Sequence, residues 1–438
     1  MSMTGWRQRS PQRQRRLRVF LVAIFLLITG IGWMRLSAPA RLTKTNHWRY
    51  NQHVDIRQLL DDGMIVVHHP RVTGKAATYS RLDWAGREAA IITTLPSPVS
   101  FRIEARSPDE RIIASFSTDA RTATLITLNS HHVISRVTFP IGLLHPPAHF
   151  DIAERYDVAV DEAGRVMIAC PNAPVVSLVA VQHGTVVAMG RCNGSLPKPK
   201  QYEGFYAQLT SDGSALVNTV TDAAATRYEY HRIEHTGQRL TTTLLWTGAR
   251  DSFDPAGAGD CMIGSDYQQD DGWIVRTVLT ATHRDTPAYA GMRLLNSQRV
   301  AGGWIAIRGS TTAFVRIQHV VSGDHWQFRC TTPAPRVYLT PDGRYALCVE
   351  PVAETPVVTL TKRCWSLAPW HKKPILLPEV RISIFERPGR LRASAYSRYG
   401  AYPAPTASWA FGTDYHLSPD GRTVVVNCEK HGATVFSW

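Results

Sequence analysis

The sequence lacks the short motifs that mark several common enzyme classes. It contains no Gly-x-Ser-x-Gly elbow, no His-Glu-x-x-His pair and no Walker-type glycine loop, so serine hydrolase, zincin and nucleotide chemistry have no motif support. It also has no Cys-x-x-Cys pair, which removes the usual spacing of zinc and thioredoxin-like redox sites. We therefore assign no catalytic, cofactor-binding or metal-binding residue from the sequence, and expect a non-catalytic protein.

The excess of basic over acidic residues is most concentrated at the N-terminus. The net charge is +14, but the first eighteen residues contain six arginines and no acidic residue. These are Arg7, Arg9, Arg13, Arg15, Arg16 and Arg18. The remaining chain is only mildly basic and has no Lys/Arg block interleaved with aromatics, so we expect no nucleic-acid partner.

One long apolar run is present, from residue 19 to residue 34, and Leu36 extends it. Flanking arginines can reach the headgroups, so residues 19–36 are predicted to form a transmembrane signal-anchor helix. The excess of positive charge before the run places a basic tail, residues 1–18, in the cytoplasm. Residues 37–48 are expected to be a linker to an extracytoplasmic domain, residues 49–438. The predicted location is the bacterial inner membrane, single-pass, with this domain in the periplasm or at the cell surface.

Two alternative export signals overlap this segment. Residues 38–40, Ala-Pro-Ala, resemble a signal-peptidase site, which would release a secreted protein, but Arg35 is an unusual residue between an apolar core and a cleavage site. The twin arginine at 15–16 lacks the bulky apolar pair that normally follows it. Each alternative also exports the large domain.

Seven cysteines are an odd number, so at least one thiol is free. Cys170, Cys348 and Cys428 fall inside apolar runs and are predicted to be small buried strand residues. A disulfide between Cys170 and Cys192 is compatible with the sequence, but is not dictated by it.

A repeated turn followed by an apolar stretch dominates the rest of the sequence. Residues 340–344 (TPDGR) and 418–422 (SPDGR) are the best copies, and looser copies occur at 61–63, 107–111, 161–165, 210–213 and 270–272. Proline fixes φ, aspartate caps the turn through its side chain and glycine takes a positive φ. A nearly continuous apolar strand should follow, as expected where both faces of a sheet are covered.

The spacing of these turns predicts a β-propeller. The turn aspartates at 62, 109, 161 and 212 are 47, 52 and 51 residues apart, which fits one four-stranded blade each. Two later intervals of 71 and 78 residues suggest degenerate blade starts near 302–307 and 379–385. The fold class is therefore all-β, a seven- or eight-bladed propeller of four-stranded antiparallel blades after one N-terminal transmembrane helix. C-terminal strands should complete a blade begun after Trp48.

The turn-and-strand repeat resembles the WD-like repeats of TolB-type propellers over nearly the whole chain after the predicted anchor. This resemblance implies the propeller fold. It says little about function, because propellers serve as scaffolds and as enzymes.

Other candidate sites are weaker. Six aspartates between residues 251 and 271 lack calcium-loop spacing and are interpreted as a solvated loop. The histidine pairs 68–69 and 131–132 would point to opposite strand faces, so we interpret them as surface or turn residues.

Aromatic residues concentrate in the least repetitive region, residues 364–415. The predicted binding surface consists of Trp365, Trp370, Tyr396, Tyr399, Tyr402 and Trp409. Rigid rings on irregular loops give contact area at low entropy cost, although rings packed between blades would look the same in sequence.

These observations predict a membrane-anchored, extracytoplasmic propeller that binds a protein or glycan partner in the cell envelope. The alternative is a propeller hydrolase or lyase whose active site lies in the central channel, built from residues of several blades. A structural accessory of another membrane protein is a third reading.

Overall fold

The computed structural model describes the strands and many of the turns that join them. The described residues are 40–48, 53–69, 77–95, 101–119, 121–144, 156–172, 175–193, 206–209, 214–220, 227–236, 239–249, 256–258, 261–268, 272–280, 292–295, 301–309, 312–332, 335–351, 380–397, 413–428 and 432–438. The chain forms two units, residues 1–41 and 42–438. In the first unit, the described part is the short strand β1 (Ala40–Arg41).

After β2 (Thr43–Trp48), the second unit continues with twelve antiparallel strands that we group into blades 1 to 3. Blade 3 is joined to the next blade in one eight-stranded sheet, because β14 (Thr185–Asn193) pairs in parallel with β18 (Arg239–Ala249). Blade 1 contains β3 (His53–Leu59), β4 (Gly63–His69), β5 (Thr78–Asp83) and β6 (Glu88–Thr94). Blade 2 contains β7 (Phe101–Arg106), β8 (Ile113–Thr118), β9 (Thr122–Leu128) and β10 (Val133–Pro140). Blade 3 contains β11 (Asp157–Val160), β12 (Val166–Asn172), β13 (Val175–Gln182) and β14 (Thr185–Asn193).

Blades 4 to 6 follow in chain order. Blade 4 contains β15 (Tyr206–Leu209), β16 (Ala215–Val220), β17 (Arg227–Thr236) and β18 (Arg239–Ala249). Three strands are described in blade 5, namely β19 (Ala256–Ala258), β20 (Cys261–Gln268) and β21 (Gly272–Thr280). Blade 6 contains β22 (Arg293–Leu294), β23 (Trp304–Arg308), β24 (Phe314–His319) and β25 (His325–Arg329). Two short 3-10 helices, η1 (Ile141–Leu144) and η5 (Ala301–Gly303), also lie in the described residues.

The last two blades complete the series. Blade 7 contains β26 (Arg336–Leu339), β27 (Tyr345–Pro351), β28 (Val380–Glu386) and β29 (Arg390–Ser397). Blade 8 contains β30 (Thr413–Leu417), β31 (Thr423–Cys428), β32 (Gly432–Ser437) and, on its outer edge, β2 (Thr43–Trp48). The described part of the chain therefore has seven four-stranded blades and three strands of an eighth.

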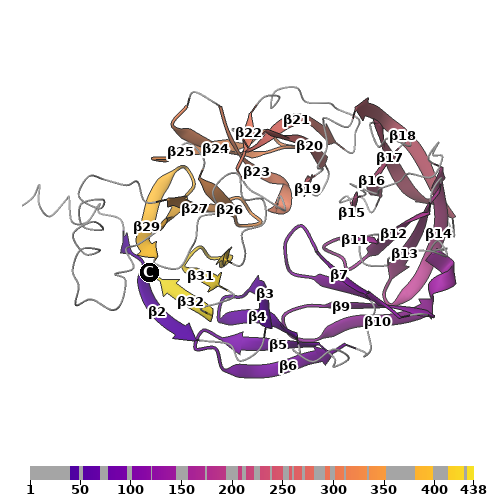
Figure 1. The fold of residues 1–438 in the computed structure, drawn as a ribbon, viewed down its shortest axis with the longest axis horizontal. Coiled ribbons are helices and arrows are strands. Elements are labelled where there is room, and N and C mark those ends of the chain that lie inside the picture. Colours follow the sequence, from indigo (N-terminus) through magenta and orange to yellow (C-terminus); the bar gives the residue numbers. More distant parts are fainter. Residues whose placement is uncertain are drawn as a thin grey trace, which may run out of the picture. The chain divides into compact units, whose positions relative to one another are not determined.

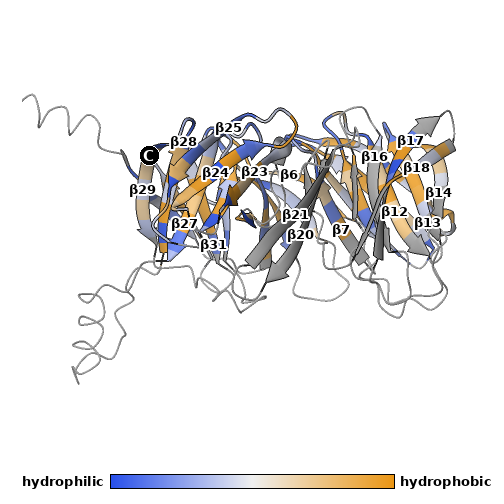
Figure 2. Ribbon diagram, turned by 90° about the horizontal axis from the view of Figure 1, so that it is seen from above, coloured by the Kyte–Doolittle hydropathy of each residue, from blue (hydrophilic) through white to orange (hydrophobic). Residues whose placement is uncertain are grey.

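The blades follow one another around a ring, with β3, β7, β11, β15 and β19 toward the middle (Figure 1). The cores lie between successive blades: Val425 of blade 8 packs with Val54 of blade 1, and Phe116 of blade 2 packs with Ile168 of blade 3. Corresponding cores join blades 1 and 2, 3 and 4, 6 and 7, and 7 and 8. Figure 2 shows the hydrophobic stretches along the strands. This arrangement is a β-propeller, as predicted.

The second strand of each well-described blade is buried on both faces, which explains its continuous apolar sequence. Every residue of β8 is buried, and so are the first six residues of β27. Each fully buried Val, Leu, Ile or Phe side chain contributes about 1.5–3 kcal/mol to the free energy of unfolding.

Ring closure is confirmed, but its first strand is earlier than predicted. β2 pairs antiparallel with β32, with Thr43 opposite Ser437 and Trp48 opposite Ala433. These residues belong to the segment that the sequence suggested was a linker. The propeller therefore starts before residue 49.

One of the two degenerate blade starts is also corrected. The stretch at 302–307 does contribute a strand of a separate blade, since β23 belongs to blade 6. The stretch at 379–385 instead forms β28, the third strand of blade 7, because it pairs with β27 on one side and β29 on the other. A continuous apolar run marks any covered strand of a blade, and so it does not locate the blade's beginning.

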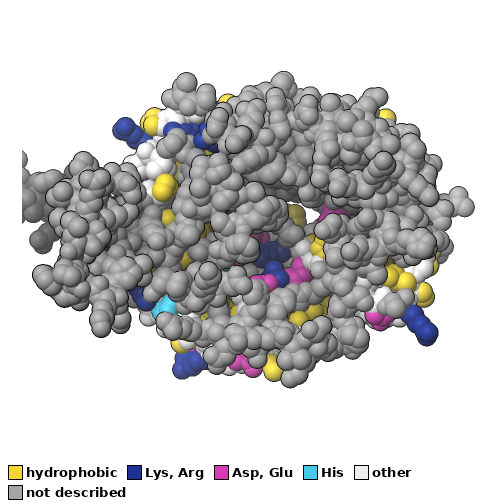
Figure 3. Space-filling model, viewed as in Figure 1, with side chains coloured by type: hydrophobic (Ala, Val, Ile, Leu, Met, Phe, Trp, Pro, Cys, Tyr) yellow, Lys and Arg dark blue, Asp and Glu magenta, His cyan; other side chains and the backbone are white. Residues whose placement is uncertain are grey.

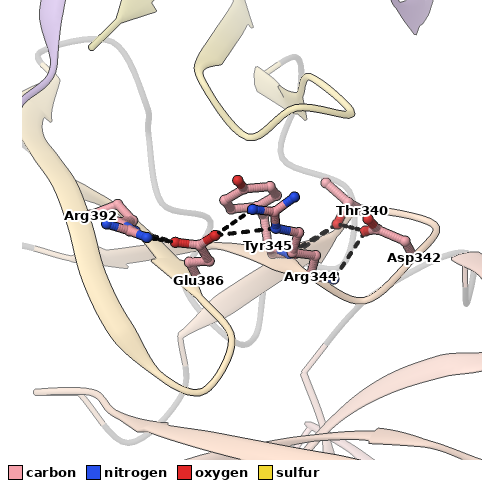
Figure 4. A network of polar contacts seen from close by, with 6 residues as sticks. All are labelled: Thr340, Asp342, Arg344, Tyr345, Glu386 and Arg392. Carbon is pink, nitrogen blue, oxygen red and sulfur yellow. Dashed lines mark hydrogen bonds and ion pairs between the residues drawn. The ribbon is translucent and has the colours of Figure 1, made fainter.

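The repeated turn has the same hydrogen bonds in blades 2, 7 and 8. In blade 7, Thr340 Oγ1 donates to Asp342 Oδ1 at 2.6 Å, and Asp342 Oδ1 accepts from the Arg344 amide at 3.0 Å. The Tyr345 amide donates to Thr340 Oγ1 at 3.0 Å. Figure 4 shows this network and its continuation to Glu386. The turn thus joins the innermost strand to the second strand with its polar groups satisfied.

The glycine of the turn is needed for two reasons. Gly343 has φ 63°, and a Cβ there would lie 2.1 Å from Cδ2 of Trp304 in blade 6. Trp326 of blade 6 also donates through Nε1 to the Gly343 carbonyl at 2.9 Å. The turn is therefore a contact between blades as well as a connection within one. In blade 2 the equivalent residue is Glu110, at φ 59°.

Candidate functional site

The predicted aromatic surface is represented in the described residues by Tyr396. Tyr396 lies near the end of β29, the fourth strand of blade 7, and it is 62% exposed. The other five, Trp365, Trp370, Tyr399, Tyr402 and Trp409, lie outside the described residues. The aromatic surface as a whole stays a prediction.

A different set of polar side chains comes together on the innermost strands of four consecutive blades. We call it the channel cluster; its members are Asp55 and Arg57 on β3, Glu104 and Arg106 on β7, Arg336 and Tyr338 on β26, and Asp414 and His416 on β30. Figure 3 shows basic and acidic side chains gathered around a hollow in the middle of the ring face. The channel cluster contains three arginines and three carboxylates.

The direction of each strand face explains the convergence. Val54 and Ile56 pack toward blade 8, so alternation along β3 turns Asp55 and Arg57 toward blade 2. In blade 2, Ala105 packs toward blade 3, so Glu104 and its neighbour Arg106 face back toward blade 1. The charged faces of β3 and β7 therefore meet.

A β-bulge positions Arg57 in this meeting. Ile56 is opposite Val66 and Gln58 is opposite Ile65, which leaves Arg57 as the extra residue. Its guanidinium forms ion pairs with Asp55 at 3.0 Å and with Glu104 at 2.8 Å. Bulges commonly redirect a side chain beside a functional site. Here the bulge lets one arginine join two blades.

Glu104 is held from a second side as well. The hydroxyl of Tyr79, a fully buried residue of β5, donates to Glu104 Oε1. The carboxylate therefore has a fixed position between Tyr79 and Arg57. Preorganised polar groups of this kind lose little entropy when a ligand binds.

Asp414 interacts electrostatically with charged residues of three other blades. Burial raises the pKa of Asp414, and the charge of Asp55 raises it further, against the opposing effect of Arg336, Arg57 and Arg106. The Asp414 residue is nevertheless exposed to solvent. A carboxyl in a channel can touch solvent and still be less well hydrated than in bulk water. The exposure of Asp414 and its raised pKa are therefore consistent.

Tyr338 borders Asp414 from blade 7. Burial raises the pKa of the Tyr338 hydroxyl, while a hydrogen bond and the charge of Arg336 lower it and Asp414 raises it. The ring of Tyr338 also packs 5.9 Å from that of Tyr415, centroid to centroid. This tyrosine stays neutral and is a hydrogen-bonding group of the wall.

His416 is a neutral imidazole in this site. Burial lowers the pKa of His416 to about 3, assisted by the positive charges of Arg106 and Arg57. Its Nε2 atom is buried and has no hydrogen-bond partner. A neutral histidine can accept or donate one hydrogen bond at this atom, depending on its tautomer.

The cluster suits a polar organic ligand better than a metal ion. Within the described ranges, no three His, Cys, Asp or Glu side chains are close enough together to hold a metal. The carboxylates of the cluster are instead separated by arginines. Arginine, carboxylate, tyrosine and imidazole groups together can hydrogen-bond hydroxyl, amide or carboxylate groups.

The sequence did contain a signal for these residues. In blades 7 and 8 the channel residues are four and two positions before the Thr or Ser that opens the turn: Arg336 and Tyr338 before Thr340, Asp414 and His416 before Ser418. The alternation of polar residues before each of these turns, and not the apolar strand after it, is the signal that locates the channel residues.

Other predicted features have mixed outcomes. Cys170 is buried and forms no disulfide, so the pairing with Cys192 that the sequence left open is not made; β13 lies between β12, which carries Cys170, and β14, which carries Cys192. Cys348 is buried as predicted.

His131 and His132 are exposed turn residues, also as predicted. Of the six aspartates, Asp266 falls in a described strand, and the other five lie outside the described residues.

The predicted span at 19–36 lies outside the described residues. Among the residues that are described, no helix is both long enough and apolar enough to cross a membrane.

No protein-family model matches the sequence, and no curated protein matches it. Solved structures with similar folds include the Dos1 propeller, which is 9% identical, with 91% of this chain and 94% of that chain covered and a TM-score of 0.41. The Cps50 (Swd1) β-propeller domain of Myceliophteria thermophila is 13% identical, with 91% and 99% covered and a TM-score of 0.37. TolB of Acinetobacter baumannii is 13% identical, with 76% and 63% covered and a TM-score of 0.31. The propeller assignment rests on the strand pairing of this chain, and these similarities carry no functional conclusion.

Proposed function

We propose that this protein is a membrane-anchored, extracytoplasmic β-propeller that binds a polar ligand, a glycan or a peptide, in its central channel. The convergence of the channel cluster on Asp414 carries this proposal. Four blades contribute charged or hydrogen-bonding side chains to one place, although a propeller needs no such residues to hold its blades together.

The cluster has properties expected of a binding site. Its arginines and carboxylates are balanced in number, and Arg57 is fixed between Asp55 and Glu104. Asp414 is reached by solvent, while the Nε2 atom of His416 is buried without a partner. Removing a ligand group from such a site leaves buried polar atoms unsatisfied, which makes the site selective.

The test is a binding screen of the full chain in detergent against arrays of oligosaccharides and of peptides. We expect binding that is weakened in Asp414→Asn and in Arg57→Met, and retained in Tyr396→Ala. An affinity that is unchanged in both channel variants, or the absence of any bound saccharide or peptide, would contradict a ligand site in the channel.

The membrane anchor is proposed from residues 19–36 and their flanking arginines. Expressed in a bacterium, the full chain should stay in the membrane fraction after alkaline carbonate washing, and external protease should digest it in spheroplasts. A protein released by the wash, or protected from protease, would contradict the anchor or its orientation.

A channel hydrolase or lyase is the second candidate, and one observation favours it. Burial and the charge of Asp55 raise the pKa of Asp414, and a carboxyl whose pKa is raised can act as a general acid. If this is an enzyme, bound oligosaccharide should be cleaved by the wild type. Asp414→Asn should then abolish cleavage and still bind substrate. Intact oligosaccharide after prolonged incubation would exclude this candidate for the substrates tested.

A further inference from the structure

Two buried polar atoms, one in the channel cluster and one on the neighbouring strand β31, have no hydrogen-bond partner. One is Nε2 of His416 and the other is Oδ1 of Asn427, a residue of β31 that is 7% exposed. Leaving a buried acceptor or donor unsatisfied destabilises the folded protein. Two such atoms near one another therefore need an explanation.

Both atoms belong to a single face of blade 8. Asp414 is directly opposite Asn427, and His416 is directly opposite Val425. Partners across a strand pair share a face, and so do residues two apart along a strand. Val425 packs against Val54 and Ile56, so this face is turned toward blade 1.

The Asn427 side chain is oriented by blade 1. Its Nδ2 atom donates to the Val54 carbonyl at 3.5 Å, a long hydrogen bond that uses one end of the amide. The other end, Oδ1, is left to accept. Asp414, His416 and Asn427 thus present a carboxyl, an imidazole and an amide oxygen on one surface, with solvent access at Asp414.

The surrounding charges argue against a charged ligand at this face. Arg57 is already paired with Asp55 and Glu104, and three arginines balance three carboxylates in the channel cluster. A charged ligand would face arginines and carboxylates that already neutralise one another. It would also lose its hydration on entering the site. The groups without partners are neutral, and hydroxyls, which both donate and accept, match them.

We propose that the face formed by Asp414, His416 and Asn427 seats a hydroxyl-bearing unit of a neutral carbohydrate. This inference rests on the proposed binding function and narrows its ligand from glycan or peptide to a neutral saccharide. Adjacent hydroxyls of one sugar ring donate to Asn427 Oδ1 and to the Asp414 carboxyl. A third polar group of the same sugar forms a hydrogen bond with His416 Nε2.

The experiment titrates the full chain in detergent by calorimetry with cellotetraose, maltotetraose and chitotetraose. Tetragalacturonate and a Gly-Ser tetrapeptide are the charged and the non-saccharide probes. Asn427→Leu and His416→Leu remove the unpartnered atoms, and His416→Gln restores a polar atom at a similar reach. Ser383→Ala is the matched control, because Ser383 Oγ is also buried without a partner but lies on β28, away from this face.

At least one neutral tetrasaccharide should bind, and both leucine variants should weaken it about tenfold or more, because each loses a buried hydrogen bond. His416→Gln should stay within about threefold of wild type, and Ser383→Ala should bind as wild type does. Without ligand, His416→Leu should unfold at a temperature no lower than wild type, because it removes an unsatisfied atom; Asn427→Leu also loses the hydrogen bond to the Val54 carbonyl, so its unfolding temperature is not used as a criterion.

Three results would overturn the inference. Unchanged saccharide affinity in both leucine variants, with a lower unfolding temperature in His416→Leu, would mean that the two atoms hold a structural water. Asp414-dependent binding of tetragalacturonate or the peptide alone would leave the channel site standing but with another ligand class. If no probe binds and the array screen also finds no Asp414-dependent ligand, the proposed function itself fails.

Discussion

In blades 2, 7 and 8 the turn and the innermost strand that enters it are adjacent, but their sequences follow different rules. In blades 2, 7 and 8 the turn repeats one set of hydrogen bonds, from Ser107, Thr340 and Ser418 to an aspartate two residues later. The strands that enter these turns carry different polar pairs each time. The comparison indicates that turns fix the frame, whereas inner strands are free to carry binding chemistry.

This separation predicts that turn substitutions change the free energy of unfolding and leave ligand affinity unchanged. Substitutions in the channel cluster should do the reverse. The following variants test the comparison, beginning with the largest expected effect.

Gly343→Ala should destabilise the protein most. The added Cβ would meet the Trp304 ring at 2.1 Å in a backbone of φ 63°, so we expect a loss of about 3 kcal/mol in the free energy of unfolding. Gly323→Ala is the matched control, with φ 78° and nothing within 4 Å of the new atom. It should lose about 1 kcal/mol. Equal losses in denaturant titrations would show that the contact between blades is unimportant.

Glu386→Ala should cost about 2 kcal/mol, because the buried carboxylate accepts from both Arg344 and Arg392. Burial alone would raise the pKa of Glu386, but the two arginines outweigh it and lower the pKa below 4.5. An acid with a lowered pKa stabilises the fold above its unfolded pKa, and that stabilisation disappears as the pH falls through the folded pKa.

The stability gap between wild type and Glu386→Gln should therefore be full at pH 7 and shrink below about pH 4.5. Glu234→Gln is the control, since its ion pair with Arg232 is solvent-exposed on the Glu234 side. It should change stability by less than about 0.5 kcal/mol. A gap for Glu386→Gln that is independent of pH would contradict the assigned ionisation.

Asp414→Asn should give a smaller effect of the opposite sign in the unliganded protein. The pKa of Asp414 is raised by burial and by Asp55, so the folded state binds its proton more tightly than the unfolded state. Stability is then lost as the pH rises from 3.8 through the folded pKa. We expect Asp414→Asn to unfold at a higher temperature than wild type at pH 7, and the difference to vanish near pH 3. A lower unfolding temperature at pH 7 would mean that Asp414 is a structural carboxylate.

Glu110→Gly is expected to have the smallest effect. Glu110 has φ 59° where blades 7 and 8 have glycine, so glycine removes strain but adds freedom to the unfolded chain. A net stabilisation of about 0.5 kcal/mol should appear in the unfolding midpoint. Destabilisation would show that the blade 2 turn depends on the glutamate side chain.

The repeated turns and the buried strands that follow them were predictable, because these turns depend on local sequence. The Pro-Asp-Gly sequences at 341–343 and 419–421 specify a turn without reference to distant residues, and the buried strands after them follow from composition. The start of the ring was not predictable: β2 has a polar sequence and is defined by its pairing with β32, which is nearly four hundred residues away.

The candidate site was not predicted for the same reason. Asp414, Arg57 and Glu104 are ordinary surface-type residues when each segment is considered alone. They become a site because three blades place them in one channel, and the bulge that redirects Arg57 is visible in the strand register alone. Aromatic density drew attention to residues such as Tyr396, which lies on an outer strand.

The most direct test of this account compares the ligand affinity of two single variants of the full chain, Asp414→Asn and Tyr396→Ala, for whichever array compound the wild type binds. A site in the channel predicts that Asp414→Asn weakens binding about tenfold or more and that Tyr396→Ala, 62% exposed on β29, leaves it unchanged. The reverse result would move the binding site from the channel to the outer aromatic surface.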